Sequence, residues 1–486
     1  MDGAESERLA SREVDKKTWG GSAFSHEASP LFAASGPNWV SCSVLPTVSA
    51  SKPMPHMLRH PPVRLALLLW GIAAAAYMVG FFLRVTPGVL NVDLMRDFHL
   101  NAAQLGNLAS FYFYFYAASQ IPTGIANDRF GPKILIVVGQ AVTGVGALLF
   151  AVAGSFESAA VARALIGLGH GVAWVSLLEL SAAWFAPRVF GTMSGLSLAL
   201  GTLGAVLAQA PLLILSHSFG WRWVLGAVGV LCLGLSLLAL LRIRNRPEDM
   251  GFDGYLPARK AQTLGEVGRG LGEVWRYRNT ALLFIAPGGV CGAFLTFTTL
   301  WGMPFLVQQR QMSAGRASWV VASMLVAFSV GGVLWGRVSD RLRRRKLPYL
   351  LGGVMMLAGF GLLVAWPQAP WSLLLLALLV SSVGSGGMVV GFAWAKESVP
   401  QRLAGTASGV HNTGVMVGAL VQLPLLGWVL DRFWTGQQAG GARLYDGTAF
   451  QAANGVLLAW IALSVLCVLL ARETHARPYA VAVAPG

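Results

Sequence analysis

The stretch GIANDRFGPK (124–133) returns in the second half of the chain as GRVSDRLRRRK (336–346). Both copies hold a glycine, followed four and five positions later by an aspartate and an arginine. These residues are Gly124, Asp128 and Arg129 in the first copy and Gly336, Asp340 and Arg341 in the second. The two aspartates lie 212 positions apart, and this interval predicts an internal duplication.

Two further pairs of stretches repeat at nearly the same interval. PRVFGTMSG (187–195) matches PQRLAGTASG (400–409), and QAPLL (209–213) matches QLPLL (422–426), at offsets of 214 and 213. Three matches at one interval predict two related halves. A duplicated bundle of apolar helices is the architecture of a carrier, because the two halves can rock about a site held between them.

The composition predicts that both halves cross a membrane. The 486 residues are 55% hydrophobic and only 12% charged, and the mean hydropathy is +0.60. Runs of about 20 apolar residues span a bilayer core, where each must be helical to satisfy its backbone. We expect an all-α membrane protein with twelve transmembrane helices in two pseudo-symmetric six-helix bundles. The expected spans are 64–88, 102–125, 132–153, 158–185, 190–216, 221–243, 280–307, 315–337, 348–366, 370–395, 403–431 and 449–471.

The organisation expected from composition has five segments. They are a disordered cytoplasmic tail (1–60), a first six-helix bundle (61–243), a cytoplasmic linker (244–279), a second six-helix bundle (280–472) and a cytoplasmic tail (473–486). Met57 directly precedes the first span and is an alternative start. Within the spans, Gly201 with Gly204 and Gly414 with Gly418 place small residues about one turn apart, which favours close approach of helices.

The charge distribution favours a membrane protein over a nucleic-acid-binding one. The formal net charge is +15, but Lys and Arg are confined to short alternate loops and the central loop, with no basic domain. By the positive-inside rule we expect both termini in the cytoplasm and a multi-pass protein of the plasma (bacterial inner) membrane. Four scattered cysteines without a CxxC or His/Cys cluster predict no metal site and no cofactor. No P-loop or GxSxG element suggests an ATP-driven pump or an enzyme.

GIANDRFGPK resembles the signature that the major facilitator superfamily carries between its second and third spans, and GRVSDRLRRRK resembles the copy between spans 8 and 9. The resemblance covers about residues 60–472 and implies alternating access. It also implies that the glycines permit close helix packing and that the aspartates form gating contacts. At the ends of spans 4 and 10, Glu179, Arg188, Glu397 and Arg402 resemble the cytoplasmic charge network of the superfamily. With Asp128 and Asp340 they are expected to form salt links between the halves that favour the outward-open state, although Glu179 is equally compatible with a local cap.

Span 4 opens with RALIGLGHG (163–171), which is similar to a pattern that the superfamily uses in proton coupling. An arginine so close to a span usually faces protein or a water-filled cavity. Arg163 is therefore a candidate coupling residue, and His170, seven positions later on the same helical face, is a second. The alternatives are an arginine that reaches the outer surface and a histidine that makes a structural hydrogen bond.

Arg84 is the expected substrate anchor. In YMVGFFLRVTPGVL (77–90), Tyr77, Phe81, Arg84 and Gly88 share one face of the first span. A buried guanidinium beside a tyrosine hydroxyl suits a planar carboxylate, which it binds through two parallel hydrogen bonds. The span resembles organic-anion branches of the superfamily, such as anion:cation symporters. The alternative is an arginine that reaches the membrane interface.

Other polar and aromatic residues are expected to complete the site. In span 2, FYFYFYAASQ (111–120) places Tyr112, Tyr116 and Gln120 on one face, although packing explains a tyrosine stripe equally well. Gln209 and Gln422 are related by the repeat, and Thr298 and Trp301 of span 7 could close the site from the second half. At the position related to Arg84, span 7 has the uncharged Phe297, which favours a monoanion over a phosphate ester.

We therefore expect a monomeric secondary active transporter that uses alternating access, with proton-coupled symport of a small, carboxylate-like organic anion. Its expected partners are this solute, protons and the lipid bilayer, with no nucleic acid. Two alternatives stay open: efflux of a drug or metabolite by proton antiport, and a membrane sensor with a transporter fold that moves no solute.

Overall fold

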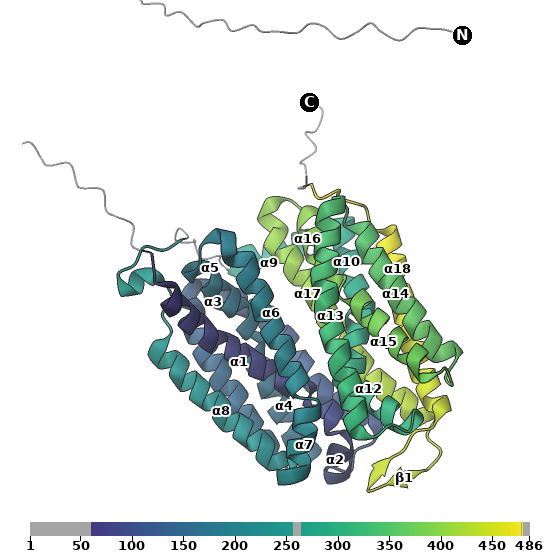
Figure 1. Ribbon diagram of the computed structural model, residues 1–486. Coiled ribbons are helices and arrows are strands. Elements are labelled where there is room, and N and C mark those ends of the chain that lie inside the picture. The colour runs from purple at the N-terminus through teal and green to yellow at the C-terminus, as the bar shows by residue number, and fades with distance from the viewer. Residues whose placement is uncertain (1–59, 256–263, 478, 480–486) are drawn as a thin grey trace, which may run out of the picture. The chain divides into compact units, whose positions relative to one another are not determined.

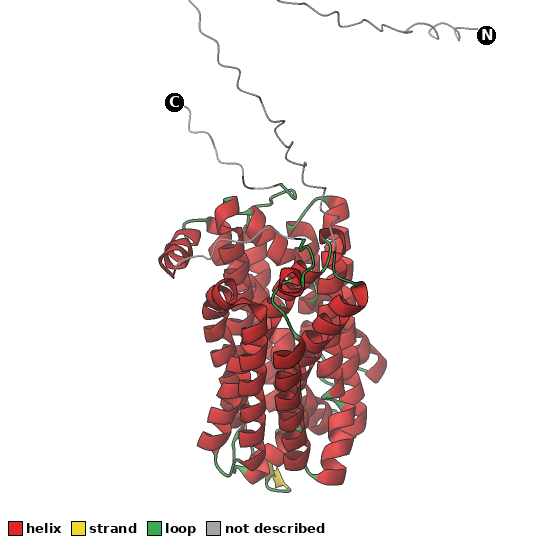
Figure 2. Cartoon of the chain, turned by 90° about the vertical axis from the view of Figure 1, so that its left-hand side faces the viewer, coloured by secondary structure: helices red, strands yellow, loops and turns green. Residues whose placement is uncertain are grey.

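The chain is described by a computed structural model over residues 60–255, 264–477 and 479, all within one compact unit, Leu58–Gly486. This unit is almost entirely helical (Figure 1, Figure 2). Its α-helices in the first half are α1 (Val63–Val89), α2 (Asn91–Asp97), α3 (Ala102–Val152), α4 (Phe156–Gly171), α5 (Ala173–Trp184), α6 (Phe190–Leu207), α7 (Ala210–Phe219) and α8 (Trp221–Arg242). Those that follow are α9 (Leu264–Val274), α10 (Arg278–Val290), α11 (Gly292–Thr296), α12 (Gly302–Pro304), α13 (Ala314–Leu342), α14 (Lys346–Ala365), α15 (Trp371–Ser385), α16 (Met388–Glu397), α17 (Ala404–Arg432) and α18 (Gly447–Leu470).

Shorter elements join or interrupt these helices. Three are 3₁₀ turns, two are π-helical stretches within span 7, and two are strands of an antiparallel hairpin in which Gln438 pairs with Arg443. They are η1 (Pro187–Val189), η2 (Pro247–Met250), η3 (Phe297–Trp301), η4 (Phe305–Gln309), η5 (Gln401–Leu403), β1 (Gln438–Ala439) and β2 (Ala442–Arg443). Of the expected linker, η2 and α9 are described, whereas the expected tail 1–59 and most of 473–486 lie outside the described residues or at their edge.

The all-α membrane fold is confirmed. Among the described residues, eleven helical segments are long and apolar enough to cross a membrane. The expected span 102–125 is not among these eleven, but it is helical as the first part of α3. Gly131 at φ 76° marks the kink where α3 turns into the next span, because this left-handed conformation strains any residue with a side chain.

The expected close approach at two glycine pairs is also found. A Cβ atom on Gly204 would stand 2.0 Å from the carbonyl oxygen of Met78, and one on Gly414 would stand 2.0 Å from that of Phe284. Neither distance is possible for a real side chain. Small residues therefore let α6 pack on α1, and α17 on α10, backbone against backbone.

Interior prolines explain several contacts between helices. A proline has no N–H, so it frees the carbonyl four residues earlier, and within a membrane that carbonyl needs another donor. Three such carbonyls accept a hydrogen bond from a side chain of a different helix. The pairs are Leu83 O with Arg163 Nη1 at 2.7 Å, Leu283 O with His411 Nδ1 at 2.8 Å, and Leu420 O with Ser110 Oγ at 3.0 Å, freed by Pro87, Pro287 and Pro424.

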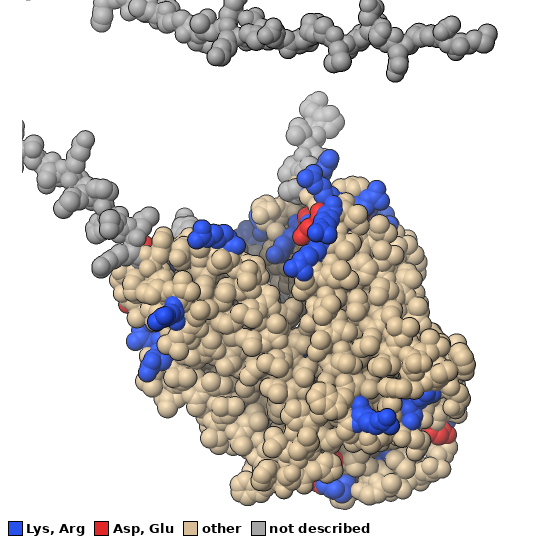
Figure 3. Space-filling view, in the orientation of Figure 1, with Lys and Arg blue, Asp and Glu red and all other residues tan. Residues whose placement is uncertain are grey.

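The two bundles meet at one end of the molecule, called here the closed end, where α3 begins and α17 finishes. A Cβ on Gly106 of α3 would stand 2.4 Å from Leu423 O, and one on Gly427 of α17 would stand 2.2 Å from Ala102 O. At the opposite end, called here the terminus end, α1 begins and α18 finishes. There a hollow separates the bundles, bordered by Lys and Arg side chains (Figure 3).

Candidate substrate site

Arg84 is a buried cation without a partner. Its side chain is 7% exposed, and its guanidinium carbon lies 3.8 Å from the centre of the Phe81 ring. No other described residue forms a hydrogen bond or ion pair with this guanidinium, and its Nε is enclosed and unsatisfied. A buried charge without a counterion is costly, so this cation is suited to receive an anion from outside the protein.

An aromatic wall from α1 and α3 surrounds this cation. The Tyr77 ring lies 4.7 Å from that of Phe81, and the Tyr112 and Tyr116 rings of α3 stack 5.7 Å apart. Arg84 interacts electrostatically with all three tyrosines. The expected grouping of Tyr77, Phe81, Arg84, Tyr112 and Tyr116 is therefore present as one cluster. This cluster can offer hydroxyl donors and a flat apolar surface around one positive charge.

His170 occupies the centre of this wall. The hydroxyl of Tyr112 lies 2.5 Å from its Nδ1, and the rings of Phe81 and Tyr116 lie 5.5 and 5.8 Å from it. Gly80 of α1 makes room for it, because a Cβ there would stand 2.0 Å from the His170 ring. The His170 Nε2 is enclosed on the far side of the ring, beside the Tyr77 backbone. The imidazole is therefore held inside the cluster from both sides.

Arg163 does not face the cluster as a free cation. It is fully buried, and it donates to the backbone oxygens of Leu83 at 2.7 Å and Arg84 at 3.4 Å. Pro87 removes the helical donor of the first oxygen, so Arg163 replaces an N–H that the helix lacks. In this conformation its contacts hold the backbone that carries Arg84, and its expected role in proton coupling stays a prediction.

Gln120 lies at the boundary between the halves. Its Nε2 donates to Gly171 O at 3.1 Å, where α4 gives way to α5, and its Oε1 accepts from Asn412 of α17 at 3.4 Å. It therefore joins the break in span 4 to the second half. A comparable break between α15 and α16 at Gly386 and Gly387 interrupts span 10, one repeat interval later.

The described hydrogen bonds of Thr298, Trp301 and Gln422 lie within the second half. Thr298 donates to Phe294 O at 2.8 Å, Trp301 to Leu423 O at 3.0 Å and Gln422 to Gly288 O at 2.8 Å. Gln209 is 1% exposed at the break before α7, and its Oε1 has no partner. Among the described residues, no hydrogen bond joins these four side chains to Arg84, and three of them satisfy backbone oxygens instead.

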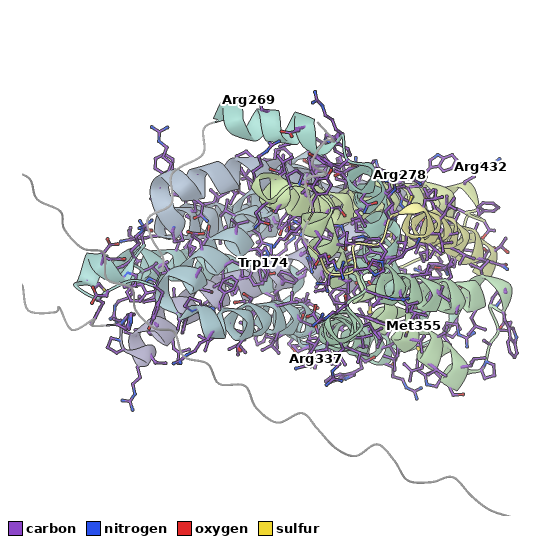
Figure 4. The ribbon with its side chains drawn as sticks, turned by 90° about the horizontal axis from the view of Figure 1, so that it is seen from above. Trp174, Arg269, Arg278, Arg337, Met355 and Arg432 are labelled. Atoms are coloured by element: carbon purple, nitrogen blue, oxygen red, sulfur yellow. The ribbon has the colours of Figure 1, made fainter. Side chains whose placement is uncertain are left out.

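A cavity of about 460 Å³ leads away from the aromatic wall toward the terminus end. Trp174 of α5 belongs to both, because its ring lies 5.3 Å from Tyr77 and it also lines the cavity (Figure 4). The outer lining includes Glu179, Arg246 and Glu248. Glu179 therefore lies beside a vestibule, and no described residue forms an ion pair with it or with the exposed Arg188.

The expected salt links between the halves are not found in this conformation. Arg345 binds the two acids of the second half that were expected to reach the first half. Its Nη1 lies 2.7 Å from Asp340 and its Nη2 lies 2.9 Å from Glu397. Burial alone would lower the pKa of Arg345, but these two carboxylates raise it above its ordinary value. Arg402 pairs with Glu273 of α9, a helix that lies at the edge of the bundles in Figure 4. The acids thus bind within the second half and its linker, because the bundles stand apart at this end.

The first copy of the repeated motif shows the same separation. Arg129 and Arg341 are exposed, and the side chain of Asp128 lies outside the described residues. A Cβ on Gly124 or Gly336 would meet no atom within 4 Å. The expected close packing at these two glycines is therefore absent here, since the opposing helix ends do not meet at the terminus end.

Sequence reasoning missed the residues of the closed end. Asp431, in the last turn of α17, accepts hydrogen bonds from the N–H groups of Ala102 and Ala103 in the other half. One signal was available, because an acid at the C-terminus of its own helix is unfavourable unless a partner holds it. A contact between the halves at Gly88 was also not predicted. This glycine lies on the same face of α1 as Arg84, and a Cβ there would stand 2.5 Å from Thr299 O of η3.

Fold and site together define a class of protein: a polytopic membrane carrier whose two helix bundles enclose an unpaired cation near their seam. The chain belongs to the Major Facilitator Superfamily, whose family model matches residues 69–313 and 283–484. It is a membrane transport protein rather than an enzyme.

Named relatives match most of the chain. The protein is 26% identical over 384 residues to the "Probable sulfoacetate transporter SauU" of Cupriavidus necator, which covers 75% of this chain and 87% of that protein. It is 25% identical to the "Probable galactarate/D-glucarate transporter GudP" of Bacillus subtilis, over 77% of this chain and 87% of that protein. It is 23% identical to the "Hexuronate transporter" of Bacillus subtilis, over 82% of this chain and 93% of that protein.

Solved structures confirm the fold. A bacterial homologue of the human lysosomal transporter Spinster, in an inward-facing and unoccupied conformation, superposes with a TM-score of 0.66 at 16% identity and covers 84% of this chain and 96% of its own. The nucleoside transporter NupG superposes with a TM-score of 0.65 at 14% identity, over 84% of this chain and 100% of its own.

Proposed function

We propose that the protein is a secondary active transporter that carries a small organic anion of the carboxylate or sulfonate class by alternating access. The observation that carries this proposal is Arg84, a buried cation with no counterion beside a wall of tyrosines. The relatives named for sulfoacetate, galactarate and hexuronate support it, because each of these solutes is an organic anion.

The position of Arg84 along the transport path also supports its assignment as the anion site. Arg84 lies one helical turn before Gly88, where α1 touches η3 of the second half. Cys291, in the second half, is close enough to Arg84 to interact with its charge. An anion on Arg84 would therefore rest above the closed end and within reach of both bundles, which is where a carrier must hold its solute.

The proposed coupling is symport with protons, with His170 as the proton carrier. Arg84 and His170 interact electrostatically, so an unpaired Arg84 opposes a second positive charge on the imidazole. A bound anion neutralises Arg84 and removes that opposition. Anion and proton then favour each other's binding reciprocally, which is the thermodynamic requirement for symport.

The proposed topology places both termini in the cytoplasm of a plasma (bacterial inner) membrane, with the protein acting as a monomer. It rests on the Lys and Arg side chains that border the hollow at the terminus end (Figure 3). With this orientation the described conformation is inward-facing. The proposed gating residues Asp128, Asp340, Glu397 and Arg402 would rearrange when the hollow closes.

Proteoliposomes test the transport assignment. We expect sulfoacetate, galactarate or glucuronate to enter vesicles against a concentration gradient when the proton gradient is directed inward, and protons to enter with the anion. Extrusion of a preloaded anion under the same gradient would indicate antiport instead. No flux of any anion under either gradient would refute the proposal.

Variants at Arg84 separate the anchor from general charge effects. Arg84→Gln should lower anion affinity by tenfold or more, because a charge-assisted hydrogen bond contributes about 1.5–3 kcal/mol. Arg84→Lys keeps the charge but loses the planar fork, so it should recover only part of the affinity. Arg96→Gln, at an exposed arginine of α2, is the matched control. Equal affinity in Arg84→Gln and Arg96→Gln would show that the anchor is misassigned.

His170→Gln tests the coupling separately. We expect this variant to bind the anion with an affinity that no longer rises on acidification, and to exchange anion across the membrane without concentrating it. Retention of proton-driven accumulation would exclude His170 as the proton carrier while leaving the anion site in place.

A further inference from the structure

The side chain of Asp431 joins the two halves at the closed end. Its Oδ1 accepts from the N–H of Ala102 at 3.2 Å, and its Oδ2 accepts from the N–H of Ala103 at 2.8 Å. Within its own half it also accepts from Arg443 Nη1 at 3.1 Å and from the Tyr445 hydroxyl at 2.8 Å. The carboxylate is 15% exposed, so water contributes little to its solvation.

The donors on the other side are N–H groups at the N-terminus of a helix, where the helix itself offers no acceptor. The first N–H groups of an α-helix lack acceptors within the helix. At the start of α3, Asn101 and Gln104 form a capping box that satisfies their own two N–H groups. The N–H groups of Ala102 and Ala103 are left over, and Asp431 accepts from both. The second half therefore completes the cap of a helix in the first half.

The placement of Asp431 is favourable only while the halves touch. A carboxylate in the last turn of α17 opposes the negative end of that helix's own dipole, whereas it complements the positive end of α3. Arg443 and Tyr445 keep the carboxylate oriented from the same half. Separation of the halves at this end would therefore expose the N–H groups of Ala102 and Ala103. The Asp431 carboxylate would keep its orientation and could bind them again when the halves meet.

The surrounding seam is built for contact at the same place. Ser110 of α3 donates to Leu420 O at 3.0 Å, and Gly427 of α17 lies against Ala102 O without space for a side chain. This seam also brings the carboxylate to hydrogen-bonding distance of α3, so that a shift of the helices by a few ångströms would break both of its bonds across the halves.

We propose that Asp431 is a latch that stabilises closure of this end, and hence the conformation open at the terminus end. The inference rests on the proposed alternating-access function, in which the closed end must open once per cycle. The latch has no role in recognising the solute, because it lies at the seam between α3 and α17 rather than in the cluster around Arg84.

Asp431→Asn tests the latch without a substrate. The amide keeps the shape but removes the charge and one of the two acceptors, so we expect the population open at this end to rise about tenfold, equivalent to about 1.4 kcal/mol. Asp446→Asn is the matched control, because Asp446 caps α18 at Ala449 within one half. Spin labels introduced by Gly154→Cys and Gln368→Cys, at exposed positions of the two halves, report the separation by pulsed electron resonance.

Hydrogen exchange provides a second measurement in the same proteins. In Asp431→Asn, the amides of Ala102 and Ala103 should exchange faster, whereas Asp446→Asn should leave them unchanged. If the distance distribution and the amide exchange of Asp431→Asn both match those of Asp446→Asn, the latch is refuted. Both readouts need no transported anion, so failure of the latch is distinguishable from failure of the proposed transport activity.

Discussion

A double-mutant cycle at Pro87 and Arg163 tests how α1 presents the substrate anchor. Pro87 removes the N–H that would bond to Leu83 O, and Arg163 supplies a replacement donor from α4 at 2.7 Å. If this account is correct, the two residues depend on each other. Pro87→Ala restores the helical N–H, and in that background Arg163→Met should be less damaging than in the wild-type protein.

The structure sets the size of the expected coupling. The bond to Leu83 O is short and charge-assisted and is worth about 1.5–3 kcal/mol. The bond to Arg84 O, at 3.4 Å, is long and adds little. Thr86 also donates to Leu83 O at 3.0 Å, so the carbonyl is not left bare when Arg163 is removed. We therefore expect a coupling energy of about 1–2 kcal/mol between the two sites.

The single change Arg163→Met should have a smaller net effect than the hydrogen bond alone suggests. The guanidinium is fully buried and has no acidic partner among the described residues. Removing it relieves a desolvation penalty of several kcal/mol, which offsets much of the lost bond. Stability can thus change little while the geometry of Arg84, and with it anion affinity, deteriorates.

Unfolding free energies of the four proteins in detergent provide the measurement. Pro424→Ala combined with Arg163→Met is the control pair, because Pro424 frees a different carbonyl, Leu420 O, which Ser110 satisfies. The control pair should be additive within about 0.5 kcal/mol. A Pro87–Arg163 coupling no larger than the control coupling would show that Arg163 does not compensate for the proline.

Three further outcomes are expected. Gly88→Ala should destabilise the protein by about 1–3 kcal/mol in thermal unfolding, because a Cβ at position 88 would stand 2.5 Å from a carbonyl oxygen of η3. Gly71→Ala is the control, because a Cβ at position 71 would have no neighbour within 4 Å. Equal melting temperatures of the two variants would contradict this prediction. Tyr112→Phe should make anion uptake depend more steeply on pH, because the mutation removes the hydroxyl that lies 2.5 Å from His170 Nδ1 and holds the imidazole in place. An unchanged pH profile of uptake would contradict this prediction. For Glu473, burial raises the pKa, but hydrogen bonds from backbone N–H groups outweigh burial and leave the pKa below its ordinary value. The stabilisation by Glu473 is therefore present at neutral pH and lost as the pH falls through this lowered pKa, so the melting temperature of Glu473→Gln should be lower at pH 7 and less sensitive to acid.

Much of the fold could be predicted because membrane helices leave strong signals. Apolar runs and the repeat gave span positions within a few residues, since lipid forces every apolar run into a helix. The second span shows the limit of this reasoning: 102–125 is helical, but it is the first part of α3, which continues through Gly131 into the third span as one element. Breaks within spans 4 and 10 were not predicted, because Gly-rich stretches are common in membrane helices and do not by themselves mark an interruption.

The site was predictable in part for a similar reason. Arg84 and its neighbours share one face of α1, and helical spacing alone places them together. The roles of Arg163 and Gln422 depend instead on which backbone carbonyls lack a donor in the folded chain. The contacts of Asp340 and Glu397 depend on how far apart the two bundles stand. One sequence must allow both the inward-open and the outward-open conformation, so it does not say which of these contacts a single conformation contains.

The duplication leaves the two halves of this carrier unequal at the closed end. One repeat interval before Asp431 stands Ser218 in α7, whose hydroxyl bonds only to Ile214 O within its own helix. Within the part of the first bundle that the structure describes, no acid binds the start of α13. Closure of this end through the proposed latch thus draws on one half alone, so that a single side chain can shift the resting balance of the cycle without disturbing the chamber where the solute rests.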